Sequence, residues 1–151
     1  MSTKIVNIEG HAKNNEQFVV KAANYDIRIG TNNQQPQLDA PSPIEYVLAG
    51  YAGCINAVGS LVANELNLDL KSLQVAISAT LDIDKYQGKP TVARAGFNAI
   101  QVIVKPEANA TITELNNWLK IVESRCPVYD NLYNATPIVS WVSELESVAT
   151  V

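Results

Sequence analysis

Residues 42–54 read Ser-Pro-Ile-Glu-Tyr-Val-Leu-Ala-Gly-Tyr-Ala-Gly-Cys, and this stretch decides the fold class. Ser42, Pro43 and Glu45 supply the N-cap, the first-turn proline and the N3 glutamate of a capping box, so a helix begins here. Apolar side chains then recur at three- and four-residue spacing as far as Leu66, among many small residues. Each of three glycines inside one helix costs about 1 kcal/mol relative to alanine. We therefore predict a largely buried helix against which another backbone packs closely.

The chain before this helix is typical of strands. Residues 4–8 alternate between polar and apolar, and 18–22 and 25–29 follow after short polar breaks. These three segments predict an antiparallel meander. Residues 30–41 are polar, contain two prolines and show no periodicity, which indicates a connecting loop.

The chain after this helix predicts a long hairpin, a second helix and a last strand. The predicted elements are a strand from Leu73 to Ile83, a strand from Ala93 to Lys105 closed by Pro106, a helix from the Thr111–Glu114 capping box to Pro127, and a short strand at 137–142. Strands followed by helices, without βαβ alternation, indicate an α+β fold. The length predicts a single domain over residues 1–151.

Composition argues against several classes of protein. A net charge of -4 and eleven scattered Lys and Arg residues argue against a nucleic-acid partner. The N-terminus lacks the apolar run of a signal peptide, and we expect no stretch able to cross a membrane, so we predict a cytoplasmic protein. One histidine, and two cysteines 72 residues apart, do not form the ligand spacing of a zinc site.

The two cysteines, Cys54 and Cys126, are the candidates for chemistry. A permanent disulfide is not expected in a reducing cytosol, which leaves buried structural thiols or reactive ones. Cysteine is among the most often buried residue types, so structural packing is the simplest interpretation. Two features favour a reactive pair: Gly53 leaves room for a small substrate beside Cys54, and Pro127 releases Cys126 from helical geometry.

The segments around both cysteines resemble a known family. Residues 42–54 are similar to the segment of OsmC/Ohr proteins that ends in a cysteine, and residues 125–132, Arg-Cys-Pro-Val-Tyr-Asp-Asn-Leu, resemble the second cysteine segment of that family. The predicted elements between them occur in the expected order over essentially the whole chain. The resemblance is closer to the general OsmC-like branch than to the organic-hydroperoxide-resistance branch.

This resemblance implies antiparallel sheets packed on two main helices, and an intertwined homodimer with its sites at the subunit interface. It also implies that Cys54 attacks a hydrogen or organic peroxide as a thiolate and becomes a sulfenic acid, and that Cys126 resolves it to a disulfide. No metal, flavin or haem is required, but an external dithiol must reduce the disulfide. The implied role is protection against oxidative or osmotic stress.

The group that stabilises the thiolate is not evident from the sequence. In the peroxidase branches an arginine of the N-terminal strands, held by a glutamate, serves this purpose, whereas the corresponding region here offers only His11 and Lys13. We therefore weigh three other residues as groups that act on the Cys54 thiolate, namely Arg28, Glu45 and Arg125. Each also has an ordinary structural interpretation. Glu45 lies nine residues before Cys54, roughly opposite on a helix of 100° per residue, and its capping role explains its presence. Tyr51, one turn before the cysteine, is weighed as a pocket residue or a core residue.

Two alternatives to a peroxidase remain open. The first is a non-catalytic OsmC-like protein that binds an apolar small molecule at its dimer interface, for which the missing arginine is the argument. The second is a purely structural or assembly role, which no feature of the sequence favours.

Overall fold

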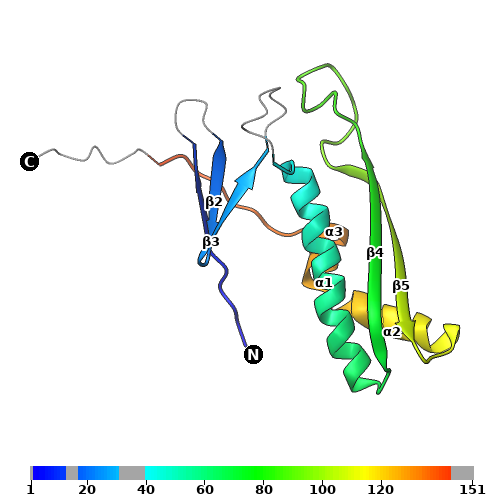
Figure 1. The fold of residues 1–151 in the computed structure, drawn as a ribbon. Coiled ribbons are helices and arrows are strands. Elements are labelled where there is room, and N and C mark those ends of the chain that lie inside the picture. The colour runs from blue at the N-terminus through cyan, green and yellow to red at the C-terminus, as the bar shows by residue number, and fades with distance from the viewer. Residues whose placement is uncertain (1, 13–16, 31–39, 144–151) are drawn as a thin grey trace, which may run out of the picture.

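The computed structural model describes residues 2–12, 17–30 and 40–143. In chain order the elements are β1 (Ile8–His11), β2 (Phe18–Ala22), β3 (Tyr25–Ile29), α1 (Pro43–Glu65), β4 (Leu70–Leu81), β5 (Phe97–Ala108), α2 (Ile112–Arg125) and α3 (Pro127–Tyr133). β1, β2 and β3 form one antiparallel sheet, and β4 and β5 form a second. The predicted α+β class is confirmed. Figure 1 shows the three-stranded sheet standing apart from the body built of α1, the β4–β5 hairpin, α2 and α3.

The N-terminal meander forms largely where predicted, but its first strand begins later. β2 and β3 match the predicted ranges, whereas β1 covers residues 8–11 and not 4–8. The reason is pairing, because Ile8 lies opposite Ala22, the last residue of β2. No strand of the described chain pairs with residues 2–7, so their alternation alone does not make a strand.

Helix α1 begins at the predicted cap. The Ser42 hydroxyl accepts from the Glu45 backbone N–H, and the Glu45 carboxylate accepts from the Ser42 backbone N–H at 2.7 Å. β3 meets the start of α1 through the Tyr46 hydroxyl, which donates to the backbone oxygen of Arg28 at 2.8 Å. Gly30, just after β3, donates its backbone N–H to the Pro41 carbonyl at 2.9 Å. Only glycine fits here, because a side chain would collide with the backbone oxygen of Ala40.

The prediction that α1 is largely buried was wrong for the single chain. One face packs against β4 and α2, and its buried residues are Tyr51, Ile55, Gly59, Val62 and Ala63. The opposite face, which we call the outer face, carries Gly50, Gly53, Ala57 and Leu61 and is exposed.

The expectation that no stretch could cross a membrane also needs correction. By length and composition alone, α1 is long and apolar enough to span one. Its packing against a sheet and a second helix is that of a core helix in a soluble domain.

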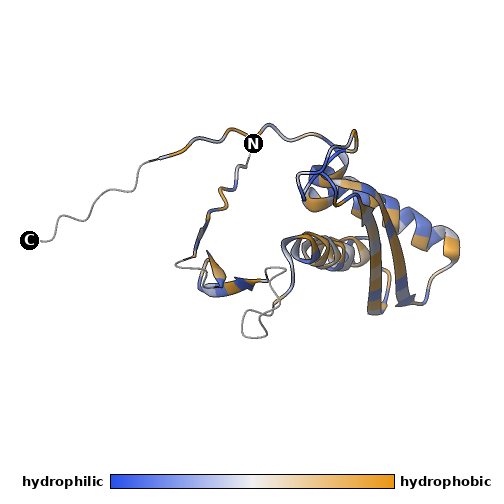
Figure 2. Ribbon diagram, turned by 90° about the horizontal axis from the view of Figure 1, so that it is seen from above, coloured by the Kyte–Doolittle hydropathy of each residue, from blue (hydrophilic) through white to orange (hydrophobic). Residues whose placement is uncertain are grey.

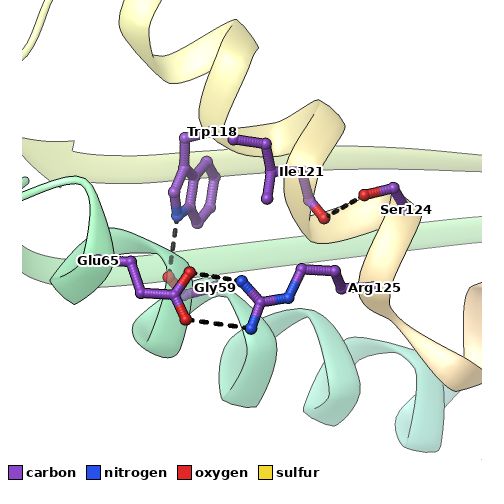
Figure 3. Close-up of polar contacts among 6 residues, drawn as sticks. All are labelled: Gly59, Glu65, Trp118, Ile121, Ser124 and Arg125. Atoms are coloured by element: carbon purple, nitrogen blue, oxygen red, sulfur yellow. Dashed lines mark hydrogen bonds and ion pairs between the residues drawn. The ribbon is translucent and has the colours of Figure 1, made fainter.

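The glycines of α1 do not meet another backbone. At Gly59 the neighbour is the Trp118 side chain of α2, whose indole Nε1 donates to the Gly59 carbonyl at 2.9 Å (Figure 3). An added Cβ at Gly59 would lie 2.8 Å from the Trp118 ring, so only glycine allows this approach. Nothing within the described chain lies within 4 Å of a Cβ added at Gly50 or Gly53. The close packing predicted for three glycines therefore occurs at one of them, against a side chain.

The long hairpin is shifted relative to its prediction. β4 runs from Leu70 to Leu81, and β5 runs from Phe97 to Ala108 with Pro106 inside the strand opposite Leu73. Pro106 does not close β5, because both strands of a two-stranded sheet have an open edge where a missing N–H breaks no ladder bond. Along both strands hydrophobic and hydrophilic residues alternate (Figure 2). The inward side chains pack against α1 and α2.

The C-terminal part differs most from the prediction. α2 starts at the Thr111–Glu114 capping box and ends at Arg125, as predicted, but Pro127 also starts α3, which was not predicted. Proline is favourable at the first position of a helix, so one residue ends α2 and begins α3. The prediction of a strand at 137–142 was wrong, since no strand of ranges 2–12, 17–30 and 40–143 pairs with these residues. Four of their large apolar side chains are 80–99% exposed, namely Ile138, Val139, Trp141 and Val142.

Candidate functional site

The two cysteines lie in contact, although 72 residues separate them. The Cys126 thiol donates to the Cys54 sulfur, with the two Sγ atoms 2.7 Å apart. Both are free thiols in this structure. A disulfide bond is about 2.05 Å long, so joining them requires a movement of roughly 0.7 Å. The pair is therefore positioned for reversible disulfide formation.

Cys126 is the buried member of the pair, with 1% of its surface exposed. It sits at the junction of α2 and α3, where it is both the C-cap of α2 and the N-cap of α3. Its sulfur accepts from the Tyr129 backbone N–H at 3.4 Å. Burial, and next the hydrogen bond to Cys54, raise the pKa of the Cys126 thiol, while the Tyr129 N–H acts in the opposite direction. The Cys126 thiol is thus covered by the protein and bonded to Cys54, with little access for solvent.

Cys54 is the more accessible member. It lies in the middle of α1 and is partly buried, at the border between the buried face and the outer face. Gly53 beside it is exposed, and apart from its own helical neighbours no described residue comes within 4 Å of a Cβ added there. A small oxidant can therefore approach Cys54 from the outer face, whereas Cys126 is covered.

Arg125 does not reach the thiols. Its guanidinium forms a two-pronged ion pair with Glu65 at the end of α1 (Figure 3), with Nη2 3.1 Å from Oε1. Glu65 lies eleven residues beyond Cys54, about 16 Å along the helix axis. The idea that Arg125 stabilises the thiolate is therefore not supported by its position. The ion pair instead links the ends of α1 and α2.

Glu45 is engaged at the helix cap. Its carboxylate accepts from the Ser42 hydroxyl as well as the backbone N–H, both at 2.7 Å. These two bonds, the backbone one first, hold the pKa of the Glu45 carboxyl below its usual value. The nine residues that separate it from Cys54 correspond to about 13 Å along the axis. The structure thus gives Glu45 its structural role, and the catalytic role stays a prediction.

Arg28 lies on β3 opposite Val19. Its backbone oxygen contacts Tyr46, two turns before Cys54 on α1, and its side chain makes no ion pair with any residue in ranges 2–12, 17–30 and 40–143. His11 is the last residue of β1. Lys13 lies outside the described residues. The role of Arg28 towards the thiolate also stays a prediction.

Two tyrosines form the wall next to the thiols. Tyr51, one turn before Cys54, is 5% exposed, and its ring centroid lies 6.3 Å from that of Tyr129. Tyr51 is thus a core residue, and its role in a pocket at Cys54 stays a prediction. Tyr129 was not singled out from the sequence. Its position three residues after Cys126, at the start of a helix, is the signal that could have identified it as an N–H donor to the sulfur.

The described residues offer sulfur chemistry and no metal centre. No group of three or more His, Cys, Asp or Glu side chains in the described ranges could hold a metal ion. Two adjacent thiols, one accessible and one buried, can instead pass between dithiol and disulfide. This is the chemistry to which the site geometry is suited.

Comparisons with known proteins identify the fold and the family. The OsmC-like protein of Mycoplasma pneumoniae is 18% identical with a TM-score of 0.75, and the match covers 89% of this chain and 91% of that one. A Legionella pneumophila organic hydroperoxide resistance protein OsmC is 14% identical with a TM-score of 0.61, covering 87% and 91%. OhrB of Bacillus subtilis, an organic hydroperoxide resistance protein, is 16% identical with a TM-score of 0.57, covering 87% and 93%.

These similarities lie at identities that establish the fold alone. No curated protein sequence matches the chain. Residues 34–140, which include both cysteines and every element from α1 to α3, match the family described as OsmC-like protein. The chain therefore belongs to the OsmC-like protein family.

Proposed function

We propose that this protein is a thiol-dependent peroxidase that acts in oxidative stress, with Cys54 as the attacking and Cys126 as the resolving thiol. The observation that carries the proposal is the 2.7 Å contact between the two sulfur atoms. Membership of the OsmC-like family, and structural relatives named organic hydroperoxide resistance proteins, support a redox or stress role. The substrate class we propose is organic hydroperoxides or hydrogen peroxide.

The proposed cycle has three steps in which atoms and electrons balance. The Cys54 thiolate attacks the terminal oxygen of ROOH, so an S–O bond forms, the O–O bond breaks, and RO⁻ leaves and takes up a proton as ROH. The Cys126 thiol then attacks the Cys54 sulfenic acid, giving the disulfide and water. An external dithiol reduces this disulfide to two thiols and is itself oxidised. The two electrons that reduce the peroxide come from cysteine sulfur and are replaced by the external dithiol, so the proposed cycle uses no metal, flavin or haem.

Burial explains the division of roles in this proposal. Cys126 is too well covered to meet a peroxide, and its raised pKa keeps it protonated until Cys54 is oxidised. Cys54 has open space beside it on the outer face.

We further propose that the protein is a cytoplasmic homodimer. The exposed outer face of α1, where Leu61 is 50% exposed, and the unpaired apolar segment 137–142 are surfaces that a second copy could cover. Such a dimer would place Cys54 at the border of the interface. We expect Leu61→Glu to dissociate the dimer in sedimentation experiments, while Tyr86→Glu, at the exposed hairpin tip, leaves it intact. A wild-type protein that sediments as a monomer at all concentrations would remove this part of the proposal.

The peroxidase proposal is tested by single-turnover oxidation of the reduced protein with cumene hydroperoxide, followed by thiol counting and mass mapping. We expect the wild type to lose two thiols per peroxide and to form the Cys54–Cys126 disulfide. Cys54→Ser should lose none, and Cys126→Ser should stop at a sulfenic acid that dimedone traps. Peroxide consumption that continues unchanged after Cys54 is alkylated would refute the proposal.

A second candidate function is binding of an apolar small molecule without catalysis. The observation that favours it is the absence, among the described residues, of a basic side chain shown in contact with Cys54 or Cys126. Native mass spectrometry distinguishes the two candidates. A co-purified apolar molecule together with slow oxidation of Cys54 would favour binding.

A further inference from the structure

A separate cavity lies beside the thiol pair, between β5 and α3. It has a volume of about 490 Å³, within the range of small-molecule sites. Neither cysteine lines it, so it is not the place where Cys54 meets an oxidant. Its apolar wall consists mainly of Tyr51, Phe97, Ile100, Tyr129, Leu132 and Tyr133. Tyr129 and Tyr133 are stacked, with ring centroids 5.6 Å apart and planes 8° apart, which gives the cavity a flat aromatic side.

One positively charged side chain lines this cavity. Arg94 lines it from the segment just before β5, and its guanidinium lies over Gly96, where an added Cβ would come within 3.0 Å of Nη2. None of the lining residues that the structure describes is a carboxylate, and Arg94 forms no ion pair within the described ranges. A lone arginine at an aromatic cavity of a protein with net charge -4 is a local positive field. The described lining therefore carries one positive charge, suited to an anion that contacts Arg94 directly, while the Glu123 carboxylate lies nearby but outside the lining.

The phenol groups around the cavity do not oppose an anion. Burial, and next the nearby Glu123 carboxylate, raise the pKa of Tyr51 to about 12. Burial likewise raises the pKa of Tyr129. Both hydroxyls are therefore neutral at physiological pH and remain hydrogen-bond donors.

We infer that this cavity binds a small amphipathic carboxylate, with its carboxylate on Arg94 and its apolar body against the wall of Phe97, Leu132 and the stacked tyrosines. A guanidinium is the side chain best suited to hold a carboxylate through two parallel hydrogen bonds. Aromatic and aliphatic side chains favour the removal of a hydrocarbon chain from water. The inference concerns binding alone and does not depend on the proposed peroxidase reaction.

The cavity adjoins the thiols at Tyr129. This residue lines the cavity, and its backbone N–H donates to the Cys126 sulfur. Tyr51 lines the cavity from α1, one turn before Cys54. A ligand that holds these two rings would therefore rest directly against the elements that carry both cysteines.

Isothermal titration of the full reduced protein with decanoate and with decanamide, below micellar concentrations, tests the inference. The two probes share one hydrocarbon chain and differ in charge. We expect decanoate to bind at least about tenfold more tightly than decanamide, since a tenfold ratio corresponds to one modest charge-assisted interaction. This comparison needs no variant. Equal binding of the two probes, or no binding of decanoate at millimolar concentration, would overturn the inference.

Two variants test whether Arg94 supplies the charge that favours decanoate. Arg94→Gln should abolish the preference for decanoate and leave decanamide binding unchanged. Lys105→Gln is the matched control, because Lys105 lies on the same strand that lines the cavity but on its exposed face, away from the helices. It removes the same charge and should change neither affinity. An equal loss of decanoate binding in both variants would show a general charge effect and would contradict the role of Arg94.

Discussion

Gly59→Ala tests whether the contact between Gly59 and Trp118 sets the packing of α1 against α2. The added Cβ would lie 2.8 Å from Cζ2 of Trp118 and 3.7 Å from Leu73. Trp118 is only 1% exposed, so its ring cannot move aside into solvent. A movement away from α1 would also stretch the 2.9 Å hydrogen bond from Nε1 to the Gly59 carbonyl.

The expected effect is the sum of three contributions. Alanine gains about 1 kcal/mol over glycine in helix propensity. Overpacking costs about 1–3 kcal/mol, and a buried hydrogen bond that is weakened or lost costs about 1–3 kcal/mol more. We therefore expect Gly59→Ala to lower the free energy of unfolding by about 1–5 kcal/mol, although propensity alone predicts stabilisation.

The assay is urea unfolding followed by far-UV circular dichroism, with the cysteines reduced and the protein concentration fixed. Trp118→Phe provides the control, because the smaller ring leaves space for the new methyl group. In a double-mutant cycle the two changes should therefore cost less together than the sum of their separate effects. A Gly59→Ala protein as stable as the wild type, or more stable, would refute the reasoning.

Four further predictions concern charged and titratable groups. Because the folded-state pKa of Glu45 is lowered, its stabilising effect is present above pH 4.5 and is lost as the pH falls through the folded value. The thermal stability advantage of the wild type over Glu45→Gln should therefore shrink between pH 6 and pH 3, and an advantage that is constant with pH would contradict this. The Arg125–Glu65 pair is exposed, so water and salt screen it and a double-mutant cycle should show only a small coupling free energy. Because its guanidinium is bound to Glu65, Arg125→Met should leave the rate of Cys54 oxidation unchanged, and a large loss of rate would restore Arg125 as an activating group. Tyr51→Phe should remove one phenol that ionises at about pH 12 from the alkaline absorbance titration, and the loss of a phenol that ionises near pH 10 would show that burial does not raise this pKa.

The sequence by itself determined the elements whose signals are local. Both capping boxes placed helix starts correctly, because Ser42 with Glu45, and Thr111 with Glu114, satisfy their bonds within four residues. Strands β2 and β3 were also predicted to the residue. The cysteine segments identified the family, which the match over residues 34–140 confirms.

Only the tertiary structure decided the features that depend on distant neighbours. Pairing with β2 determines where β1 begins, and the absence of a paired strand leaves 137–142 outside any sheet of the described chain. The close approach of the Trp118 ring requires glycine at position 59, one of the three glycines in α1. The contact of Cys54 with Cys126, the Arg125–Glu65 ion pair and the cavity at Arg94 join residues far apart in sequence. Periodicity and capping act within a few residues, whereas charge pairing, burial and thiol proximity depend on how α1, α2 and the hairpin pack, so these parts of the site required the folded chain.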